Sequence, residues 1–151
     1  MRRYFTALLM VLSICAILLR PATAAQDVTP PTLAGFTISP TTVTGTGDAP
    51  QTLTFTATAT DDLSGVAAIQ VTVRTSDTNA NILQDMRLTF AIPNAPTLST
   101  GTISGSITLP QFSHTGTWVV LVEVKDAVQN VQAYTTSQLA ALGFASTFTV
   151  Q

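Results

Sequence analysis

Hydrophobic and polar residues alternate along most of the chain with a period of two. Residues 51–61 read Q-T-L-T-F-T-A-T-A-T-D, so apolar side chains take every second position and threonines take the others. Because successive side chains of a strand point to opposite faces, this pattern predicts a strand with its apolar face in a core and its threonines in solvent. The turn-forming sequence D-D-L-S-G follows it.

Similar patterns mark the other expected strands. These strands cover residues 33–39, 66–75, 84–90, 101–109, 117–126, 131–134 and 146–150. Trp118 shares a face with three valines, so we expect it in the core. Residues 137–143, S-Q-L-A-A-L-G, interrupt the series, and we expect at least one helical turn there, ending at Gly143. About seven strands at regular spacing, without long helices, predict an all-β protein with an immunoglobulin-like Greek-key β-sandwich.

The first residues have the three parts of a secretory signal peptide. Arg2 and Arg3 supply positive charge, residues 4–19 are apolar, and A-T-A at 22–24 supplies the small residues of a cleavage site. We therefore expect a signal peptide at 1–24 and a single immunoglobulin-like domain at 25–151, secreted or held at the cell surface. The apolar run is short of the roughly 20 residues of a membrane span, and an uncleaved anchor is the alternative.

The net charge of the expected mature chain limits the classes of partner that it could bind. Cleavage would remove three of the six Lys and Arg residues and none of the eight Asp and Glu residues, leaving a formal net charge of −5. Such an acidic chain disfavours nucleic acid and anionic membranes, which call for basic patches. The single cysteine, Cys15, lies in the leader, so disulfides and thiolate metal sites are excluded from the mature domain.

Three stretches of the chain resemble a known kind of module. They read D-V-T-P-P-T-L with a following I-S-P, A-T-A-T-D-D-L-S-G-V, and G-T-W-V-V-L-V-E-V-K-D with a trailing asparagine. Together they are similar to the bacterial immunoglobulin-like modules of secreted and cell-surface proteins, β-sandwiches of cadherin or fibronectin III type. Such modules usually carry D-x-x-G-N after the late strand. Here Gln129 replaces that glycine, which puts the usual geometry of the turn in doubt.

Acidic residues follow two of the expected strands. In a sandwich of this topology, the loops after the second strand and after the Trp118 strand lie at one pole, where the first strand also begins. This would bring together Asp61, Asp62, Asp126 and Asn130, with Asp27 as a further candidate. Carboxylates, amide oxygens and water are the ligands of calcium, so we consider a calcium site there. The alternative is that these side chains cap turns by bonding their own backbone.

The remaining chemistry of the chain does not indicate an enzyme. His114 is the sole histidine, and although Ser113 is adjacent, neighbouring residues on an extended loop point apart. No nucleophile-elbow motif is present in the sequence. One histidine and no remaining cysteine also disfavour zinc.

Two extended features could contact a flat ligand. The threonines of residues 52–60 form one clear row on the expected solvent face. The preference of threonine for strands explains this row without a ligand. Glycan binding usually needs exposed aromatic rings. The candidate platforms are Phe36, Phe90, Phe112, Tyr134 and Phe144. We expect a non-enzymatic module that acts in protein–protein contact, in adhesion or as a structural element, the alternative being a small module that binds calcium or a glycan.

The leader makes a direct prediction about the exported protein. Expression of the full chain with export should yield a product that begins at Ala25, because the small residues at 22 and 24 direct signal peptidase to cut after Ala24. Intact-mass measurement checks this. A product that keeps residues 1–24 and fractionates with membranes would show that the leader is an anchor.

Overall fold

The computed structural model describes residues 26–44, 46–76, 85–91 and 99–151, so the expected signal peptide lies outside the described residues. The elements are β1 (Thr32–Ser39), β2 (Thr42–Val43), β3 (Gln51–Thr60), β4 (Val66–Thr75), β5 (Asp85–Ala91), β6 (Thr100–Leu109), β7 (Gly116–Asp126), β8 (Val131–Tyr134), α2 (Thr136–Ala141) and β9 (Thr147–Val150). No helix among these residues has the length and apolar character to cross a membrane.

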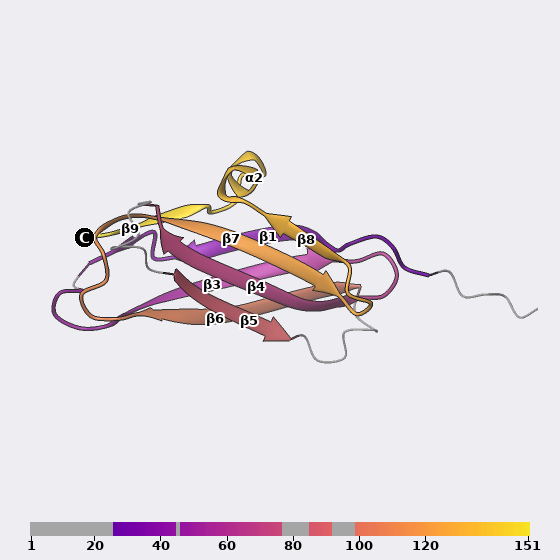
Figure 1. Cartoon of the computed structure of the whole chain (residues 1–151), viewed down its shortest axis with the longest axis horizontal. Coiled ribbons are helices and arrows are strands. Elements are labelled where there is room, and N and C mark those ends of the chain that lie inside the picture. Colours follow the sequence, from indigo (N-terminus) through magenta and orange to yellow (C-terminus); the bar gives the residue numbers. More distant parts are fainter. Residues whose placement is uncertain (1–25, 45, 77–84, 92–98) are drawn as a thin grey trace, which may run out of the picture.

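The strands form two sheets that face each other (Figure 1). One sheet has the order β1-β3-β6, and the other has the order β2-β9-β7-β4-β5 with β8 also paired to β7. All pairs are antiparallel except β2 with β9. The predicted all-β, sandwich-like architecture is therefore confirmed, and the strands expected from the alternation of residues are all present.

The core lies between the two sheets and follows the predicted alternation. In β3 the apolar positions are buried from Leu53 to Ala59, while the threonines between them are exposed or half-buried. Trp118 is fully buried on β7, and its ring stacks on Phe148 of β9 with centroids 5.7 Å apart. Its indole Nε1 donates a hydrogen bond of 2.9 Å to the carbonyl of His114, so the buried polar atom is satisfied.

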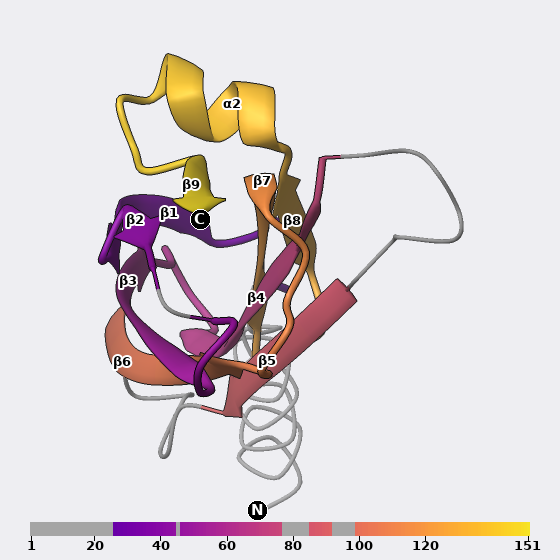
Figure 2. The same cartoon turned by 90° about the vertical axis from the view of Figure 1, so that its left-hand side faces the viewer.

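One edge of β7 is shared by two short strands with a helix between them. β8 pairs with the second half of β7 and β9 with its first half, while α2 lies outside the sheets (Figure 2). A capping box between Thr135 and Gln138 starts α2, and the buried Leu139 holds it against the domain. The helix ends before Gly143, whose φ of 76° suits glycine, so the predicted stop is at the expected residue.

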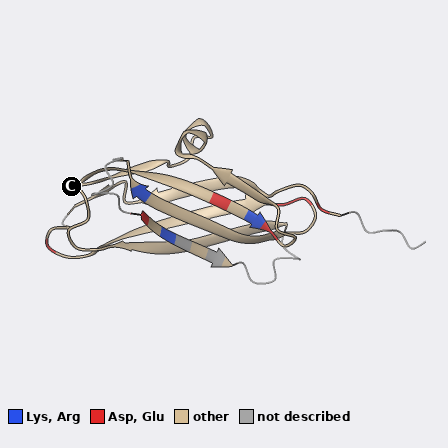
Figure 3. Ribbon diagram, viewed as in Figure 1, with Lys and Arg blue, Asp and Glu red and all other residues tan. Residues whose placement is uncertain are grey.

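The alternation of residues could not reveal two features of the sheets. β2 is too short to show a period, and it is held by parallel pairing with Thr149 and Val150. In addition, each threonine of β3 from 52 to 60 lies opposite a threonine or serine of β6. The hydroxyls of Thr56 and Ser104 are hydrogen-bonded at 2.9 Å, so the outer face of this sheet has a second hydroxyl row. The charged residues in the described part of the chain lie instead on β4, β5 and β7 and in the loops at the two ends (Figure 3).

The packing of Trp118 makes a prediction about stability. Trp118→Ala should lower the free energy of unfolding by about 3–5 kcal/mol, because it leaves a large cavity beside Phe148. The chain has a single tryptophan, so urea unfolding must be followed by far-UV circular dichroism rather than by fluorescence. Val119→Ala, at a half-buried neighbouring position, is the control. Equal losses for both variants would contradict the assignment of Trp118 as a core anchor.

A candidate metal centre at the acidic pole

Three loops meet at the end of the sandwich where the described chain begins, the right-hand end in Figure 1. They are the segment before β1, the turn between β3 and β4, and the turn after β7. Each contributes one aspartate: Asp27, Asp61 and Asp126. One carboxylate oxygen from each residue lies within 4.8 Å of the others, and we call this group the acidic pole.

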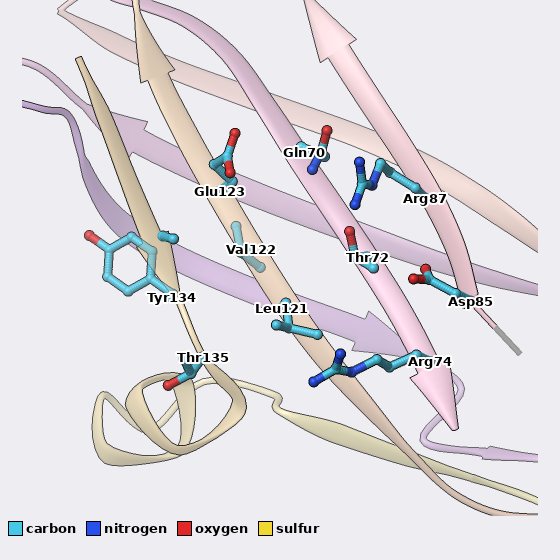
Figure 4. Close-up of a pocket in the computed structure, with 11 residues that line it drawn as sticks. Gln70, Thr72, Arg74, Asp85, Arg87, Leu121, Val122, Glu123, Tyr134 and Thr135 are labelled. Carbon is cyan, nitrogen blue, oxygen red and sulfur yellow. The ribbon is translucent and has the colours of Figure 1, made fainter. Parts of the chain in front are cut away.

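The acidic pole is removed from solvent. Asp126 is fully buried, Asp27 is 8% exposed and Asp61 is 9% exposed. Lys125 is next to Asp126 in the chain, but adjacent strand residues point to opposite faces, so its side chain starts on the outer side of the sheet. The arginines, Arg74 and Arg87, also line the outer face of the sheet (Figure 4). Buried carboxylates normally need a partner charge or several hydrogen bonds.

Asp61 closes the turn between β3 and β4. Its Oδ2 accepts hydrogen bonds from the backbone N–H groups of Leu63 at 3.1 Å and Gly65 at 2.6 Å. Gly65 has a φ of 85°, a conformation that glycine adopts without a steric penalty. The D-D-L-S-G sequence therefore folds as a turn because the Asp61 carboxylate accepts the hydrogen bonds of N–H groups that have no backbone acceptor there.

Asp126 closes the turn after β7 in a similar way. Its Oδ1 accepts from the backbone N–H groups of Val128 at 2.9 Å and Asn130 at 2.7 Å, and its Oδ2 accepts from the Asn130 side-chain amide at 2.6 Å. Gln129 lies between them with a φ of 79°. Gln129 thus adopts the left-handed conformation at the position where the D-x-x-G-N pattern has glycine, so the turn forms without that glycine.

Asp27 joins the N-terminal segment to the other two loops. Its Oδ1 accepts from the N–H of Thr29 at 3.0 Å and its Oδ2 from the N–H of Ser64 at 2.8 Å. The pKa of Asp27 is lowered from its ordinary value of 3.8, chiefly by the nearby Ser64 hydroxyl, although that hydroxyl lacks good hydrogen-bond geometry. The N–H groups of Thr29 and Ser64 act in the same direction, and burial opposes them.

Two polar atoms at the acidic pole are left without partners. The Oδ1 of Asp61 and the hydroxyl of Ser64 are buried and accept or donate no hydrogen bond. Buried polar side-chain atoms are paired in the large majority of cases, so an orphaned carboxylate oxygen needs an explanation. A cation bound between the three carboxylates would supply both the missing partner and the missing positive charge, and oxygen-only donors suit a hard divalent ion.

The sequence-based candidates do not all belong to this group. Asp61 and Asp126 are brought together, and Asp27, the further candidate, completes the three. Asp62 is exposed and lines a shallow hollow beside the group, together with Thr29 and Thr60. The side-chain amide nitrogen of Asn130 donates to the carboxylate of Asp126 and so orients it. The same nitrogen donates to the backbone carbonyl of Asp27 at 3.3 Å.

The burial of Asp61 and Asp126 could have been predicted from the alternation of residues in the strands that precede them. Asp61 follows Leu53, Phe55, Ala57 and Ala59 at the next position of the same period of two. Asp126 similarly follows Trp118, Val120, Val122 and Val124. Both aspartates are therefore on the core-facing side of their strands, whereas Asp62 falls on the solvent side. Extending the alternation by one step selects the buried pair.

The other candidate chemistry lies elsewhere. Among the aromatic platforms, Phe36 and Tyr134 are buried, Phe144 is half-buried and Phe112 is 75% exposed, while the Phe90 side chain is outside the described set. A second hollow lies on the outer face of the six-stranded sheet (Figure 4). Two arginines and two acidic residues line it, so its charges balance. Its charged residues are Arg74, Arg87, Asp85 and Glu123.

The lowered pKa of Asp27 predicts an acid-sensitive contribution to stability. A carboxyl whose pKa is lower in the folded state stabilises the fold above its unfolded value of 3.8, and this contribution is lost as the pH falls through the folded value. In the presence of chelator, Asp27→Asn should be less stable than wild type at pH 7, and the difference in unfolding free energy should shrink as the pH falls below 3.8. Urea unfolding at several pH values checks this, with Asp62→Asn as the control. A gap that stays constant with pH would contradict it.

Comparison with known proteins gives a likeness of fold only. No protein-family model matches the chain, and no curated protein matches it. Among solved structures, the chain is similar to the crystal structure of a protein from Bordetella pertussis described as ApaA. The match has 13% sequence identity and a TM-score of 0.41, and it covers 82% of this chain and 98% of that one. At this identity and score the likeness assigns neither a family nor a function.

Proposed function

We propose that the chain is an extracellular, non-enzymatic immunoglobulin-like module that binds one calcium ion at its acidic pole and serves as a structural or adhesive element in contact with other proteins. The strand order supports the immunoglobulin-like assignment. The order β1-β3-β6 facing β9-β7-β4-β5 is a two-sheet antiparallel arrangement of the Greek-key kind. The leader at residues 1–24 supports export.

The unpartnered Oδ1 of Asp61 is the observation that carries the calcium proposal. Turn capping accounts for the other oxygen of Asp61 and for the oxygens of Asp27 and Asp126 that accept backbone N–H groups. It does not account for a buried carboxylate oxygen without a donor beside two more carboxylates. A cation at this position removes the cost of that arrangement.

Calcium fits this donor set better than other common ions. It accepts six to eight oxygen ligands in irregular geometry, including carboxylates that also hold hydrogen bonds, with water completing the set. Magnesium requires near-ideal octahedral geometry and gives up its water reluctantly. Structural zinc sites are built from cysteine and histidine ligands, and the acidic pole has neither. His114 precedes β7 while Asp126 ends this 11-residue strand, so about 33 Å separates the two ends.

The distance between His114 and the acidic pole also supports a non-enzymatic role. His114 is the sole histidine of the chain, and the acidic pole is too far away to orient it as a general base. The buried aspartates themselves accept hydrogen bonds from backbone groups of their own loops, which fits side chains that hold structure. An ion there would tie the N-terminal segment and two loops together, and so stiffen the end of the module.

Calcium titration tests this proposal. Exported protein freed of metal by chelator should bind about one calcium ion per chain by isothermal titration calorimetry. Its melting temperature should rise with calcium, since a ligand at 100 times its Kd stabilises the fold by about 2.7 kcal/mol. Asp61→Asn should abolish both effects, because it removes charge at the orphaned oxygen. Asp62→Asn, exposed in the same turn, should bind as wild type does.

The two variants separate the possible outcomes. No heat and no change in melting temperature at millimolar calcium would overturn the proposal. Equal loss of binding in Asp61→Asn and Asp62→Asn would place the ion at the surface and would contradict the buried site. A gain in metal-free stability in Asp61→Asn, without calcium binding by wild type, would show that the three carboxylates only repel one another.

A further inference from the structure

The three-stranded sheet ends at β6, which lies below β3 in Figure 1. β6 has ten residues, Thr100–Leu109, and pairs with β3 along its whole length without a register shift. Among the described residues, no strand pairs with the other side of β6. Every second residue of β6 therefore directs its backbone N–H and C=O groups away from the sheet, where a further strand would find hydrogen-bond partners.

The other edge strands of the described chain have features that hinder the addition of a strand. β1 has a register shift between Leu33 and Gly35, and β5 has the charged residues Asp85 and Arg87. β2 has two residues and β8 has four. Irregular pairing, charge and shortness are the usual means by which proteins protect sheet edges. β6 is long and regular and contains no proline and no charged residue, so it is the edge best suited to pairing with another strand.

The sequence of β6 reads the same in both directions. Residues 102–108 are T-I-S-G-S-I-T, with Gly105 at the centre. If two copies of this strand pair antiparallel about Gly105, each residue lies opposite an identical residue of the second copy. The pairs are Thr102 with Thr108, Ile103 with Ile107, and Ser104 with Ser106. The strand is therefore complementary to itself, which a contact between identical surfaces of two copies requires.

Both faces of such a pairing are favourable. On the outer face a hydroxyl would lie opposite a hydroxyl, as happens within the chain, where Thr58 and Thr102 are hydrogen-bonded at 3.0 Å. On the core side an isoleucine would lie opposite an isoleucine. Ile103 is half-buried in one copy whereas Ile107 is buried, so the second copy would cover the Ile103 side chain that its own domain leaves accessible. Cross-strand pairs of both kinds stabilise sheets.

We propose that two copies of the chain associate by antiparallel pairing of their β6 strands about Gly105, which joins their three-stranded sheets into one sheet of six strands. This goes beyond the proposed function, because it names a second copy as a protein partner and does not involve the calcium ion. A two-fold contact uses the same strand on both copies, so the assembly closes at the dimer.

The acidic character of the chain opposes this contact only weakly. In the three-stranded sheet, Asp48 precedes β3, and Asp61 and Asp62 follow it. The β3 strands of the two copies would be three strand spacings apart, about 14 Å. That distance exceeds the Debye length of about 8 Å at physiological ionic strength. β5, which contacts β6 from the other sheet, has one charge of each sign, Asp85 and Arg87.

Sedimentation velocity of the exported protein, from micromolar to millimolar concentration, tests the association. Wild type should approach the dimer as its concentration rises and form nothing larger. Ser104→Lys combined with Ser106→Lys should weaken association at least tenfold, because each lysine would lie opposite a lysine of the second copy. The same pair of substitutions to glutamate should do so too, and an equimolar mixture of the lysine and glutamate variants should dimerise again.

The matched control places the same two charges on the opposite edge of the same sheet. Thr37→Lys combined with Ser39→Lys, at exposed positions of β1, should dimerise as wild type does. Equal loss of association in this control and in the β6 lysine variant would attribute the effect to net charge and would contradict the β6 contact.

Disulfide formation tests the register. Cys15, the sole cysteine, is removed with the expected leader. An equimolar mixture of Ser104→Cys and Ser106→Cys chains should form a disulfide-linked dimer under mild oxidation, because the two positions would face each other with Cα atoms about 4.5–5.5 Å apart. Ser104→Cys alone should link at least tenfold more slowly. Faster linking by Ser104→Cys alone than by the mixture would overturn the pairing about Gly105.

Calcium binding separates this inference from the proposed function. The β6 lysine variant should be monomeric and should still bind calcium as wild type does, and wild type should dimerise in the presence of chelator. Wild type that stays monomeric at millimolar concentration would overturn the inference, whether or not it binds calcium. A dimer that the β6 lysine variant leaves unchanged would overturn it too. Dimerisation without calcium binding would support it and would overturn the calcium site alone.

Discussion

The burial of three carboxylates at one end of the sandwich is the constraint on which the rest of that end depends. Negative charges in a medium of low polarity repel strongly unless donors or cations compensate them. Backbone N–H groups supply most of the compensation here, and they come from the turns in which the aspartates lie. Asp27 also accepts from Ser64, and Asn130 reaches back to the carbonyl of Asp27. The carboxylates thus connect the segment before β1 to the turn that crosses from one sheet to the other and to the turn between β7 and β8.

The same constraint accounts for several local choices along the chain. Gly65 and Gln129 have positive φ values in turns that direct two N–H groups, two residues apart, at one carboxylate. Gln129 does so without the freedom of glycine, which indicates that the bonds to Asp126 outweigh the strain. The backbone N–H groups do not reach the Oδ1 of Asp61, which therefore has no hydrogen-bond donor. The proposed calcium ion would complete the arrangement and tie the three loops together.

The alternation of residues was sufficient to predict most of the strands because burial on one face imposes a period of two. It gave the limits of β4 and β8, and it placed Trp118 in the core. It could not give β2, which is two residues long and depends on pairing with a distant strand. The second hydroxyl row was also missed, since only the register of β3 with β6 brings those side chains opposite one another.

The candidate site was predictable in part for the same reason. Asp61 and Asp126 extend core-facing alternations, so their burial is encoded locally, whereas the approach of Asp27 depends on where the N-terminal segment crosses the pole. The sequence does not distinguish an asparagine that offers its oxygen to an ion from one that donates to a carboxylate, and Asn130 donates.

The most direct measurement is a crystal structure of the exported protein grown with calcium, with data collected at a wavelength where calcium scatters anomalously. The account predicts an anomalous peak between Asp27, Asp61 and Asp126, with the Oδ1 of Asp61 about 2.3–2.6 Å from it. Absence of a peak, with an ordered water or a protonated carboxyl partnering that oxygen, would contradict it.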